Sequence, residues 1–251
     1  MTLAPPLDPH SALFLDLDGT LLEIAPRPEL VAAPEGLAEL LARVARQRGG
    51  ALAVISGRRI DDLDRYLRPW RGAAAGVHGA ERRDAAGRIA TGGNSVEDRR
   101  AAAALARLRP ALREIERRIP GVLLEDKGRT LAVHYRQAPE REPEIRAAVA
   151  SLLRRETAAL RLIDGKMVLE LKPIHHDKGR AIAAFMAEEP FRGRLPVFAG
   201  DDTTDEDGFA EVNRRGGVSV RVGPESSATK AAFSLPSVAA VLDWLRGGGA
   251  G

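Results

Sequence analysis

Four short segments contain residue types that can bind a phosphate group together with a metal ion. The first is Asp16-Leu17-Asp18-Gly19-Thr20, which directly follows an apolar run. Two carboxylates this close together repel each other unless a cation joins them, and Mg²⁺ prefers oxygen ligands and phosphate. Gly19 allows a sharp turn of the backbone. An acidic loop turn is the ordinary explanation, but the apolar run in front and Gly-Thr behind favour a metal site.

The second segment, Ser56-Gly57-Arg58, follows another apolar run. A serine hydroxyl and the adjacent backbone N–H groups at the start of a helix can hold a phosphate. Taken alone, the segment is better explained by Ser56 as the N-cap of the next helix. Its position adds weight to the phosphate hypothesis, because it ends a predicted strand as the first segment does.

The third segment contains Lys178, at the start of a predicted helix. The helix dipole opposes a lysine in that position, so a nearby phosphate or carboxylate cluster would explain it. A solvated lysine is the more common case for any single lysine. His175 and His176 precede it and could form a metal site, but exposed loop histidines are the favoured interpretation.

The fourth segment, residues 200–207, contains four aspartates and one glutamate. An acidic helix start, with Thr204 or Asp205 as its cap, explains Asp205 and the acids after it. It explains Asp201 and Asp202 poorly, because these two lie at the end of a predicted strand. So many like charges would repel one another without a cation, and this segment therefore also indicates a metal site.

The elements that must position these segments alternate between buried strands and amphipathic helices. The strands are predicted at 12–17, 51–55, 196–199 and 218–222, and the helices at 35–48, 59–67, 178–188, 205–214 and 238–245. This alternation predicts an α/β fold with a Rossmann-like parallel sheet covered by helices. In such a sheet a ligand site lies beyond the carboxyl ends of the strands. Three of the segments follow such strand ends, and the segment that contains Lys178 begins a helix of the same sheet.

The middle of the chain follows a different order, αββαββ, which predicts a small antiparallel sheet with helices on one face. The helices are predicted at 95–119 and 143–157, and the strands at 122–126, 130–136, 160–163 and 167–171, with Asp164-Gly165 as a hairpin turn. We therefore predict a core domain, 1–94 and 172–251, interrupted by an inserted α+β domain, 95–171. Hinges are expected near Ser95 and Leu171–Pro173.

The composition excludes several kinds of protein. The chain has no cysteine, which rules out disulfides, thiolate zinc sites and cysteine nucleophiles. Its net charge is only +3 and no segment concentrates the basic residues, so we expect no nucleic-acid partner. The amino terminus has no basic n-region, and there is no run of about 18 apolar residues. These features predict a soluble, cytoplasmic protein with no membrane partner.

Together and in this order, the four segments resemble the motifs of the haloacid dehalogenase-like (HAD) phosphohydrolase superfamily. The resemblance implies that Asp16 is the nucleophile and that Asp18 is the general acid and base. It implies a magnesium ion held by the Asp16 carboxylate, the main-chain carbonyl of Asp18 and Asp201. Further residues of the motifs would hold the phosphoryl group or support the metal site: Ser56, Gly57, Arg58, Lys178, Thr20, Asp202 and Asp205.

Further motifs are similar to those of the trehalose-6-phosphate phosphatases: GVHGAE (76–81), EDKG (125–128), HYR (134–136), GKMVLELKP (165–173) and GDDTTDEDGF (200–209). This resemblance implies a magnesium-dependent phosphatase that acts on trehalose 6-phosphate through an aspartyl-phosphate, with the inserted domain as a cap. It implies substrate contacts at His78, Glu125, Lys127, Arg136, Lys166 and Glu170. Cross-strand ion pairing is the ordinary explanation for the charged residues of the cap. Residues 175–177 depart from the family, which more often has asparagine before the lysine.

Other functions stay open at this point. The nearest alternative is another capped sugar phosphatase, acting on sucrose 6-phosphate or a mannosyl phosphate. A non-catalytic sugar-phosphate sensor would have no need of a nucleophile, so the intact set of Asp16, Asp18, Lys178 and Asp201 argues against it. A phosphotransferase or mutase would return the phosphoryl group to a sugar. A functional link to a trehalose-6-phosphate synthase is a further expectation.

Overall fold

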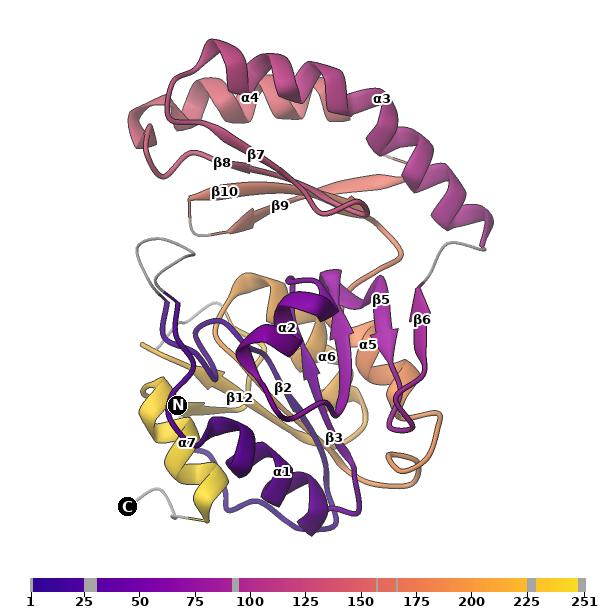
Figure 1. Ribbon diagram of the computed structural model, residues 1–251, viewed down its shortest axis with the longest axis vertical. Helices are drawn as coiled ribbons and strands as arrows, with labels where there is room; N and C mark the ends of the chain where they lie inside the picture. Colours follow the sequence, from indigo (N-terminus) through magenta and orange to yellow (C-terminus); the bar gives the residue numbers. More distant parts are fainter. Residues whose placement is uncertain are drawn as a thin grey trace. The chain divides into compact units, whose positions relative to one another are not determined.

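The computed structural model describes residues 2–24, 31–91, 95–156, 158–165, 167–224 and 229–247 (Figure 1). The chain divides into two compact units: unit 1 consists of Met1–Thr91 and Asp177–Gly251, and unit 2 of Gly92–His176. The predicted crossings at 94/95 and 171/172 differ from these positions by a few residues. Unit 2 therefore includes Pro173 and the two histidines that follow it.

Unit 1 is built on a mixed sheet, which has nine strands within the described residues, in the order β1-β13-β12-β11-β2-β3-β4-β5-β6. The pairs from β1 to β4 are parallel, and β5 and β6 extend the sheet in antiparallel fashion. The strands are β1 (Thr2–Leu3), β2 (Ala12–Leu15), β3 (Leu52–Ile55), β4 (Ala73–Gly76), β5 (Glu81–Arg83), β6 (Ile89–Thr91), β11 (Pro196–Gly200), β12 (Val218–Val222) and β13 (Phe233–Leu235).

Helices cover both faces of this sheet (Figure 1). One face carries α1 (Leu37–Gln47), α2 (Ile60–Tyr66) and α7 (Val238–Arg246), and the other carries α5 (Lys178–Phe185) and α6 (Glu206–Arg214). Successive side chains of a strand point to opposite faces, so Leu13 and Leu15 of β2 enter the first core while Ala12 and Phe14 enter the second. Burial on both faces explains why β2 reads as a continuous apolar run.

The register of the parallel strands brings three of the predicted segments to one edge of the sheet. Leu15 at the end of β2 pairs with Ala199 in β11 and with Val54 in β3. The residues that follow these strands therefore leave the sheet side by side. Asp16 and Asp201 come directly after β2 and β11, and Ser56 comes directly after β3.

Some elements of unit 1 differ from the prediction. Strand β2 ends at Leu15, because the carbonyl of Leu17 already accepts turn hydrogen bonds from the N–H groups of Leu21 and Leu22. Strand β4 was not predicted, because its residues are Ala-Ala-Ala-Gly and both alanine and glycine are depleted in strands. The short strands β1, β5, β6 and β13 were not predicted either. The described residues of the unit also include two single turns of 3₁₀-helix, η2 (Val77–Gly79) and η4 (Thr203–Asp205).

Unit 2 follows the predicted order αββαββ. Its antiparallel sheet has the order β7-β8-β10-β9, and two helices pack on one face of it (Figure 1). The elements are α3 (Val96–Arg118), β7 (Leu123–Asp126), β8 (Leu131–His134), η3 (Pro139–Arg141), α4 (Glu142–Leu153), β9 (Leu160–Gly165) and β10 (Val168–Pro173).

Two local predictions in unit 2 are wrong. Asp164 pairs with Leu169 and Gly165 pairs with Val168, so both residues belong to β9 and do not form the hairpin turn. The favourable cross-strand contacts of β9 extend the strand past the Asp-Gly signal. Strand β8 ends at His134, so Arg136 lies in the turn that follows and not in the strand.

Candidate active site

The centre of the candidate site in unit 1 is a buried ammonium group between two carboxylates. Lys178, the first residue of α5, donates from Nζ to Oδ1 of Asp16 at 2.7 Å and to Oδ1 of Asp205 at 2.6 Å. All three side chains are buried. The backbone N–H of Asp16 donates to the carbonyl of Ala199 at 2.9 Å, which fixes Asp16 between β2 and β11. The position of Lys178 at a helix start is therefore explained by its carboxylate partners.

A divalent cation fits the carboxylates of this cluster. One oxygen from each of Asp16, Asp201 and Asp205 lies within 4.8 Å of the others. Three carboxylates and one ammonium leave two negative charges when all are ionised, and an all-oxygen donor set suits a hard ion such as Mg²⁺. Gly19 makes room for Asp201, because a Cβ atom at Gly19 would lie 2.1 Å from Oδ2 of Asp201. The glycine of the first segment is thus required by this close approach as well as by its positive φ of 79°.

The pKa shifts reflect this crowding of charge. Burial acts to lower the pKa of Lys178, but the charges of Asp16 and Asp205 outweigh it and hold that pKa well above its ordinary value. Burial raises the pKa of the Asp16 carboxyl, and the charges of Asp205 and Asp201 raise it further against the opposing effect of Lys178. A cation among these carboxylates would favour their ionised forms.

Asp18 lies apart from this carboxylate cluster and is held by an arginine. Nε of Arg58 donates to Oδ2 of Asp18 at 2.7 Å, and Nη2 donates to Oδ1 at 2.7 Å. The guanidinium of Arg58 also lies over the ring of Tyr66, 4.8 Å from its centroid. The side chain of Asp18 remains 35% exposed, so solvent or a ligand can reach this ion pair.

Ser56 does not cap the following helix, contrary to its ordinary explanation. Helix α2 begins at Ile60 with Arg59 as its N-cap, and the hydroxyl of buried Ser56 accepts a hydrogen bond from the N–H of Arg58 at 3.1 Å. Next to it, Gly57 packs against His78: a Cβ atom at Gly57 would lie 2.8 Å from Nε2 of that histidine. His78 is buried and holds a left-handed backbone with φ of 55°. The structure therefore brings Ser56, Gly57, Arg58 and His78 together.

Asp205 is the N-cap residue of α6, one of the two predicted caps, although its side chain makes no capping hydrogen bond to that helix. Asp202 caps η4 through its side chain, which accepts from the N–H of Thr203 at 2.7 Å, and Asp205 accepts from the N–H of Asp202 at 2.9 Å. Asp205 is fully buried against Lys178 and belongs to the carboxylate cluster, which an acidic helix start does not explain. Thr20 is also fully buried, and its hydroxyl makes no hydrogen bond to another described residue.

The predicted sugar-contacting residues belong to unit 2, where three of them lie together. Glu125 and Glu170 both pair with Ala132 in the sheet, so they lie on the same face. Lys127 Nζ lies 3.4 Å from Oε1 of Glu170 and 4.0 Å from Oε2 of Glu125. Glu170 also accepts from the hydroxyl of Thr130 at 2.7 Å. The cross-strand ion pairing that the sequence allowed is therefore present in the structure.

The other two predicted residues of unit 2 are placed differently. Arg136 is exposed and follows β8 at the end of the sheet where β10 begins, away from the β7–β8 hairpin that carries Lys127. Lys166 lies outside the described residues.

Comparison with known proteins identifies the family. The family model described as trehalose-phosphatase matches residues 14–239. A trehalose-6-phosphate phosphatase of Escherichia coli (strain K12) is 45% identical over 98% of this chain and 89% of its own length. The chain belongs to the trehalose-phosphatase family.

Two solved structures are similar to this chain. A trehalose-6-phosphate phosphatase related protein is 27% identical, with a TM-score of 0.75 over 93% of this chain and 95% of its own. A phosphatase of the haloalkanoate (HAD) superfamily from Bacteroides thetaiotaomicron has a TM-score of 0.60 over 93% of this chain and 92% of its own. The second is only 16% identical and shows the fold alone. The predicted family and the predicted HAD-like fold with a separate antiparallel sheet are confirmed.

Proposed function

We propose that this member of the trehalose-phosphatase family hydrolyses trehalose 6-phosphate to trehalose and phosphate. The observation that supports the proposal most directly is the buried group of Asp16, Lys178 and Asp205 at the carboxyl ends of β2 and β11. Such a group combines a nucleophilic carboxylate with positive charge where a phosphoryl group would bind. The E. coli relative named as trehalose-6-phosphate phosphatase indicates the sugar.

In the proposed first step, a carboxylate oxygen of Asp16 attacks the phosphorus atom. The bond between phosphorus and the sugar oxygen breaks, and Asp18 donates a proton to that leaving oxygen. The product is trehalose and an aspartyl-phosphate on Asp16. Lys178 holds Asp16 in place through its 2.7 Å hydrogen bond, so the nucleophile needs no large rearrangement to react.

In the second step, Asp18 removes a proton from water, and the water oxygen attacks the phosphorus atom of the aspartyl-phosphate. The bond from phosphorus to Asp16 breaks, which releases inorganic phosphate and restores the carboxylate. Asp16, Asp201 and the main-chain carbonyl of Asp18 would hold Mg²⁺, which supplies positive charge to neutralise the phosphoryl oxygens. Ser56 and the backbone around Gly57 and Arg58 bind the same phosphoryl group.

Unit 2 provides the residues that distinguish one sugar from another. The phosphoryl-binding residues contact a group that all sugar phosphates share, so they cannot select trehalose. The hydroxyls of the sugar are proposed to be hydrogen-bonded by five residues of unit 2: Glu125, Lys127, Arg136, Lys166 and Glu170. His78 of unit 1 is proposed as a further substrate contact. Polar groups of this kind discriminate strongly, because a ligand that lacks the matching hydroxyl leaves them unpaired.

The setting of the reaction is also part of the proposal. Within the described part of the chain, no helix has both the length and the apolar character that crossing a bilayer requires. We place the enzyme in the cytoplasm, where its substrate would come from a trehalose-6-phosphate synthase. Physical association with such a synthase stays a prediction.

The experiment that tests the proposed function measures both products of one reaction. Purified protein with Mg²⁺ and trehalose 6-phosphate should release trehalose and phosphate in equal amounts. A protein that binds trehalose 6-phosphate without releasing phosphate would be a sensor. Transfer of the phosphoryl group to another sugar hydroxyl, without release of phosphate, would indicate a phosphotransferase or mutase.

A further inference from the structure

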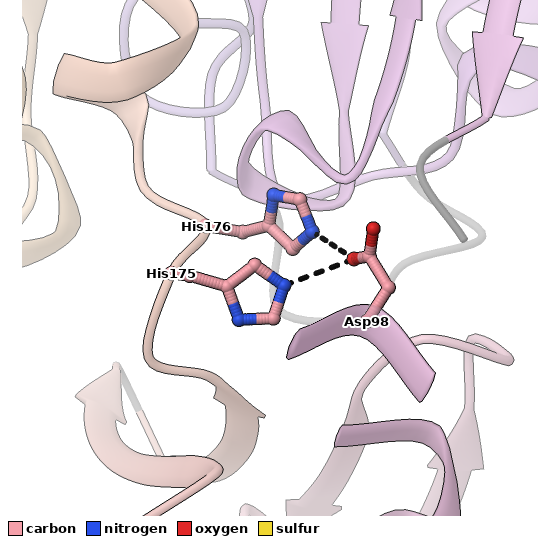
Figure 2. Close-up of side chains that lie close together, drawn as sticks. All are labelled: Asp98, His175 and His176. Atoms are coloured by element: carbon pink, nitrogen blue, oxygen red, sulfur yellow. Dashed lines mark hydrogen bonds and ion pairs between the residues drawn. The ribbon is translucent and has the colours of Figure 1, made fainter. Parts of the chain in front are cut away.

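A second group of possible metal ligands lies within unit 2, apart from the residues of the proposed reaction. Nε2 of His175 lies 2.9 Å and Nε2 of His176 lies 2.7 Å from the same oxygen, Oδ1 of Asp98. Figure 2 shows both imidazole rings pointing toward that carboxylate. The ring centroids are 4.3 Å apart and the ring planes are inclined at 46°. Two imidazole nitrogens and one carboxylate oxygen therefore lie within 4.8 Å of one another, and the histidines are not exposed, contrary to the prediction.

The carboxylate of Asp98 is also held by a second residue, Ser95. Asp98 lies in the first turn of α3, whose N-cap is Ser95. The hydroxyl of Ser95 donates to Oδ2 of Asp98 at 2.9 Å and accepts from its backbone N–H at 2.9 Å. One carboxylate oxygen is thus bound by Ser95, and the other faces the two imidazoles. A hydrogen bond of this kind to a ligating carboxylate is the usual outer-shell support of a metal site.

The histidines are also constrained. They follow β10 after one intervening residue, Ile174, and the N–H of His176 closes a turn to the carbonyl of Pro173 at 3.4 Å. The side chains are only 16% and 17% exposed, and that of Asp98 is 9% exposed. Solvent can reach the group, but the side chains have little freedom to leave it. A metal ion would consequently find its ligands already gathered.

The protonation states suit a metal ion. Burial lowers the pKa of the His176 imidazole, and the nearby charges of His175 and Arg129 lower it further against the effect of Asp98. Burial acts to raise the pKa of Asp98, but the hydrogen bonds from His175, His176 and Ser95 outweigh it and hold that pKa well below its ordinary value. A metal ion requires a neutral imidazole and an ionised carboxylate, and these two shifts favour the neutral form of His176 and the ionised form of Asp98.

We propose that Asp98, His175 and His176 form a binding site for Zn²⁺ or a similar borderline transition-metal ion. Two imidazole nitrogens and one carboxylate oxygen, with solvent as the fourth ligand, are a common donor set for zinc. Zinc–ligand bonds of about 2.0–2.2 Å would separate the donor atoms by more than their present distances, so each side chain must move outward slightly. Mg²⁺ prefers oxygen ligands and would not compete well here.

Zinc at this site would join the beginning of unit 2 to its end. Asp98 is separated from the two histidines by 77 and 78 residues of sequence. A ligand that binds only the folded form stabilises it, so zinc should raise the thermal stability of unit 2. The proposed phosphatase reaction uses other residues, with Asp16, Asp18 and Lys178 at its centre.

The test compares zinc binding by the complete protein and by single-residue variants, with excess Mg²⁺ present to occupy the acidic cluster of unit 1. After removal of free metal, the unmodified protein should retain about one equivalent of Zn²⁺. Loss of an outer-shell partner typically weakens metal binding by roughly 10–100-fold, and we expect zinc affinity to fall within that range for Ser95→Ala. We expect a larger loss of zinc affinity for each variant of a proposed ligand: Asp98→Asn, His175→Gln and His176→Gln. His134→Gln is the matched control, because His134 forms a single histidine–carboxylate pair with Glu125 at 2.8 Å in the same unit.

Substitution by Co²⁺ gives a second measurement, which can be made on the unmodified protein itself. Cobalt absorbs visible light strongly when four-coordinate with imidazole ligands and weakly in an octahedral oxygen site. We expect the strong spectrum in the unmodified protein and in His134→Gln, and its loss in His176→Gln. The proposal is overturned if the unmodified protein shows only the weak spectrum. It is equally overturned if folded variants at positions 98, 175 and 176 retain zinc as the unmodified protein does.

Discussion

Arg58 binds both carboxylate oxygens of Asp18 with its guanidinium group, at 2.7 Å for each contact. The two residues lie 40 positions apart in the sequence and follow two neighbouring strands, β2 and β3. Both oxygens of Asp18 are occupied by this pair. If Asp18 is the general acid, at least one of these hydrogen bonds must break before the carboxyl group can contact the leaving sugar oxygen. The phosphoryl group of the substrate is a suitable competitor, since arginine binds phosphate oxygens in the same two-pronged manner.

We therefore expect Arg58 to act in catalysis by positioning Asp18. Arg58→Lys keeps the charge but loses the two-pronged contact, so kcat for trehalose 6-phosphate should fall by roughly 10²-fold, the lower end of the range for general acid–base catalysis. Steady-state kinetics provide the measurement. Arg59→Lys is the control, because Arg59 is half exposed and its ion-pair distances to Asp61 and Glu81 are 3.9 and 3.8 Å. If Arg58→Lys raised KM alone, Arg58 would only bind phosphate.

Asp16→Asn should abolish phosphate release, because an amide is a poor nucleophile. It should also stabilise the metal-free protein, since it removes one of three carboxylates that crowd together in a buried site. We expect the thermal midpoint to rise by roughly 2–4 °C, which corresponds to about 1 kcal/mol in the free energy of unfolding for a protein of this size. Calorimetry without divalent ions measures this change, and mass spectrometry checks that the new asparagine has not deamidated. Turnover close to that of the unmodified protein would contradict the covalent mechanism.

Removal of divalent metal should stop the reaction. The carboxylates of Asp16, Asp201 and Asp205 carry more negative charge than Lys178 balances, so the phosphoryl group would meet net repulsion. Exhaustive chelation should reduce phosphate release to background, and added Mg²⁺ should restore it. Asp201→Asn should raise the Mg²⁺ concentration needed for half-maximal activity. Full activity in chelated protein would show that the cluster acts without a metal ion.

The charged residues on the sheet of unit 2 should determine the choice of sugar. Lys127→Ala and Glu170→Gln should each lower kcat/KM for trehalose 6-phosphate by about 10²-fold, yet change turnover of p-nitrophenyl phosphate by no more than about twofold. The small ester has no sugar hydroxyls for these groups to bind. Arg109→Gln is the matched control, because it breaks the exposed ion pair of Arg109 with Asp126 at 2.6 Å in the same unit. Equal losses on both substrates would mean that Lys127 and Glu170 only maintain the fold.

Much of the fold could be predicted because its signals are local. The apolar runs of β2, β3 and β11 are recognisable since these strands are buried on both faces. The strand β4 could not be recognised, because the small residues Ala73–Gly76 form a strand only between β3 and β5. Tertiary pairing overrides weak intrinsic propensity in such cases.

In the candidate site, too, the features with a local sequence signal could be predicted, and those that depend on long-range contacts could not. Spacing alone indicated Asp16, Asp201 and Lys178, because each follows a strand or begins a helix. The burial of Asp205 against Lys178 was hidden by an adequate local explanation, the acidic start of a helix. Two further groups join residues that are distant in sequence: Arg58 with Asp18, and Asp98 with His175 and His176. No local sequence pattern predicts such contacts.

The proposed function is tested most directly by competition between substrates. The purified protein with Mg²⁺ is given three substrates together at equal concentration: trehalose 6-phosphate, sucrose 6-phosphate and glucose 6-phosphate. Mass spectrometry follows the loss of each substrate. We expect trehalose 6-phosphate to be consumed first, with a kcat/KM at least about 10²-fold above those of the other two, as hydrogen-bonded recognition of the sugar allows. Equal consumption of all three, or a preference for sucrose 6-phosphate or glucose 6-phosphate, would contradict the proposed substrate.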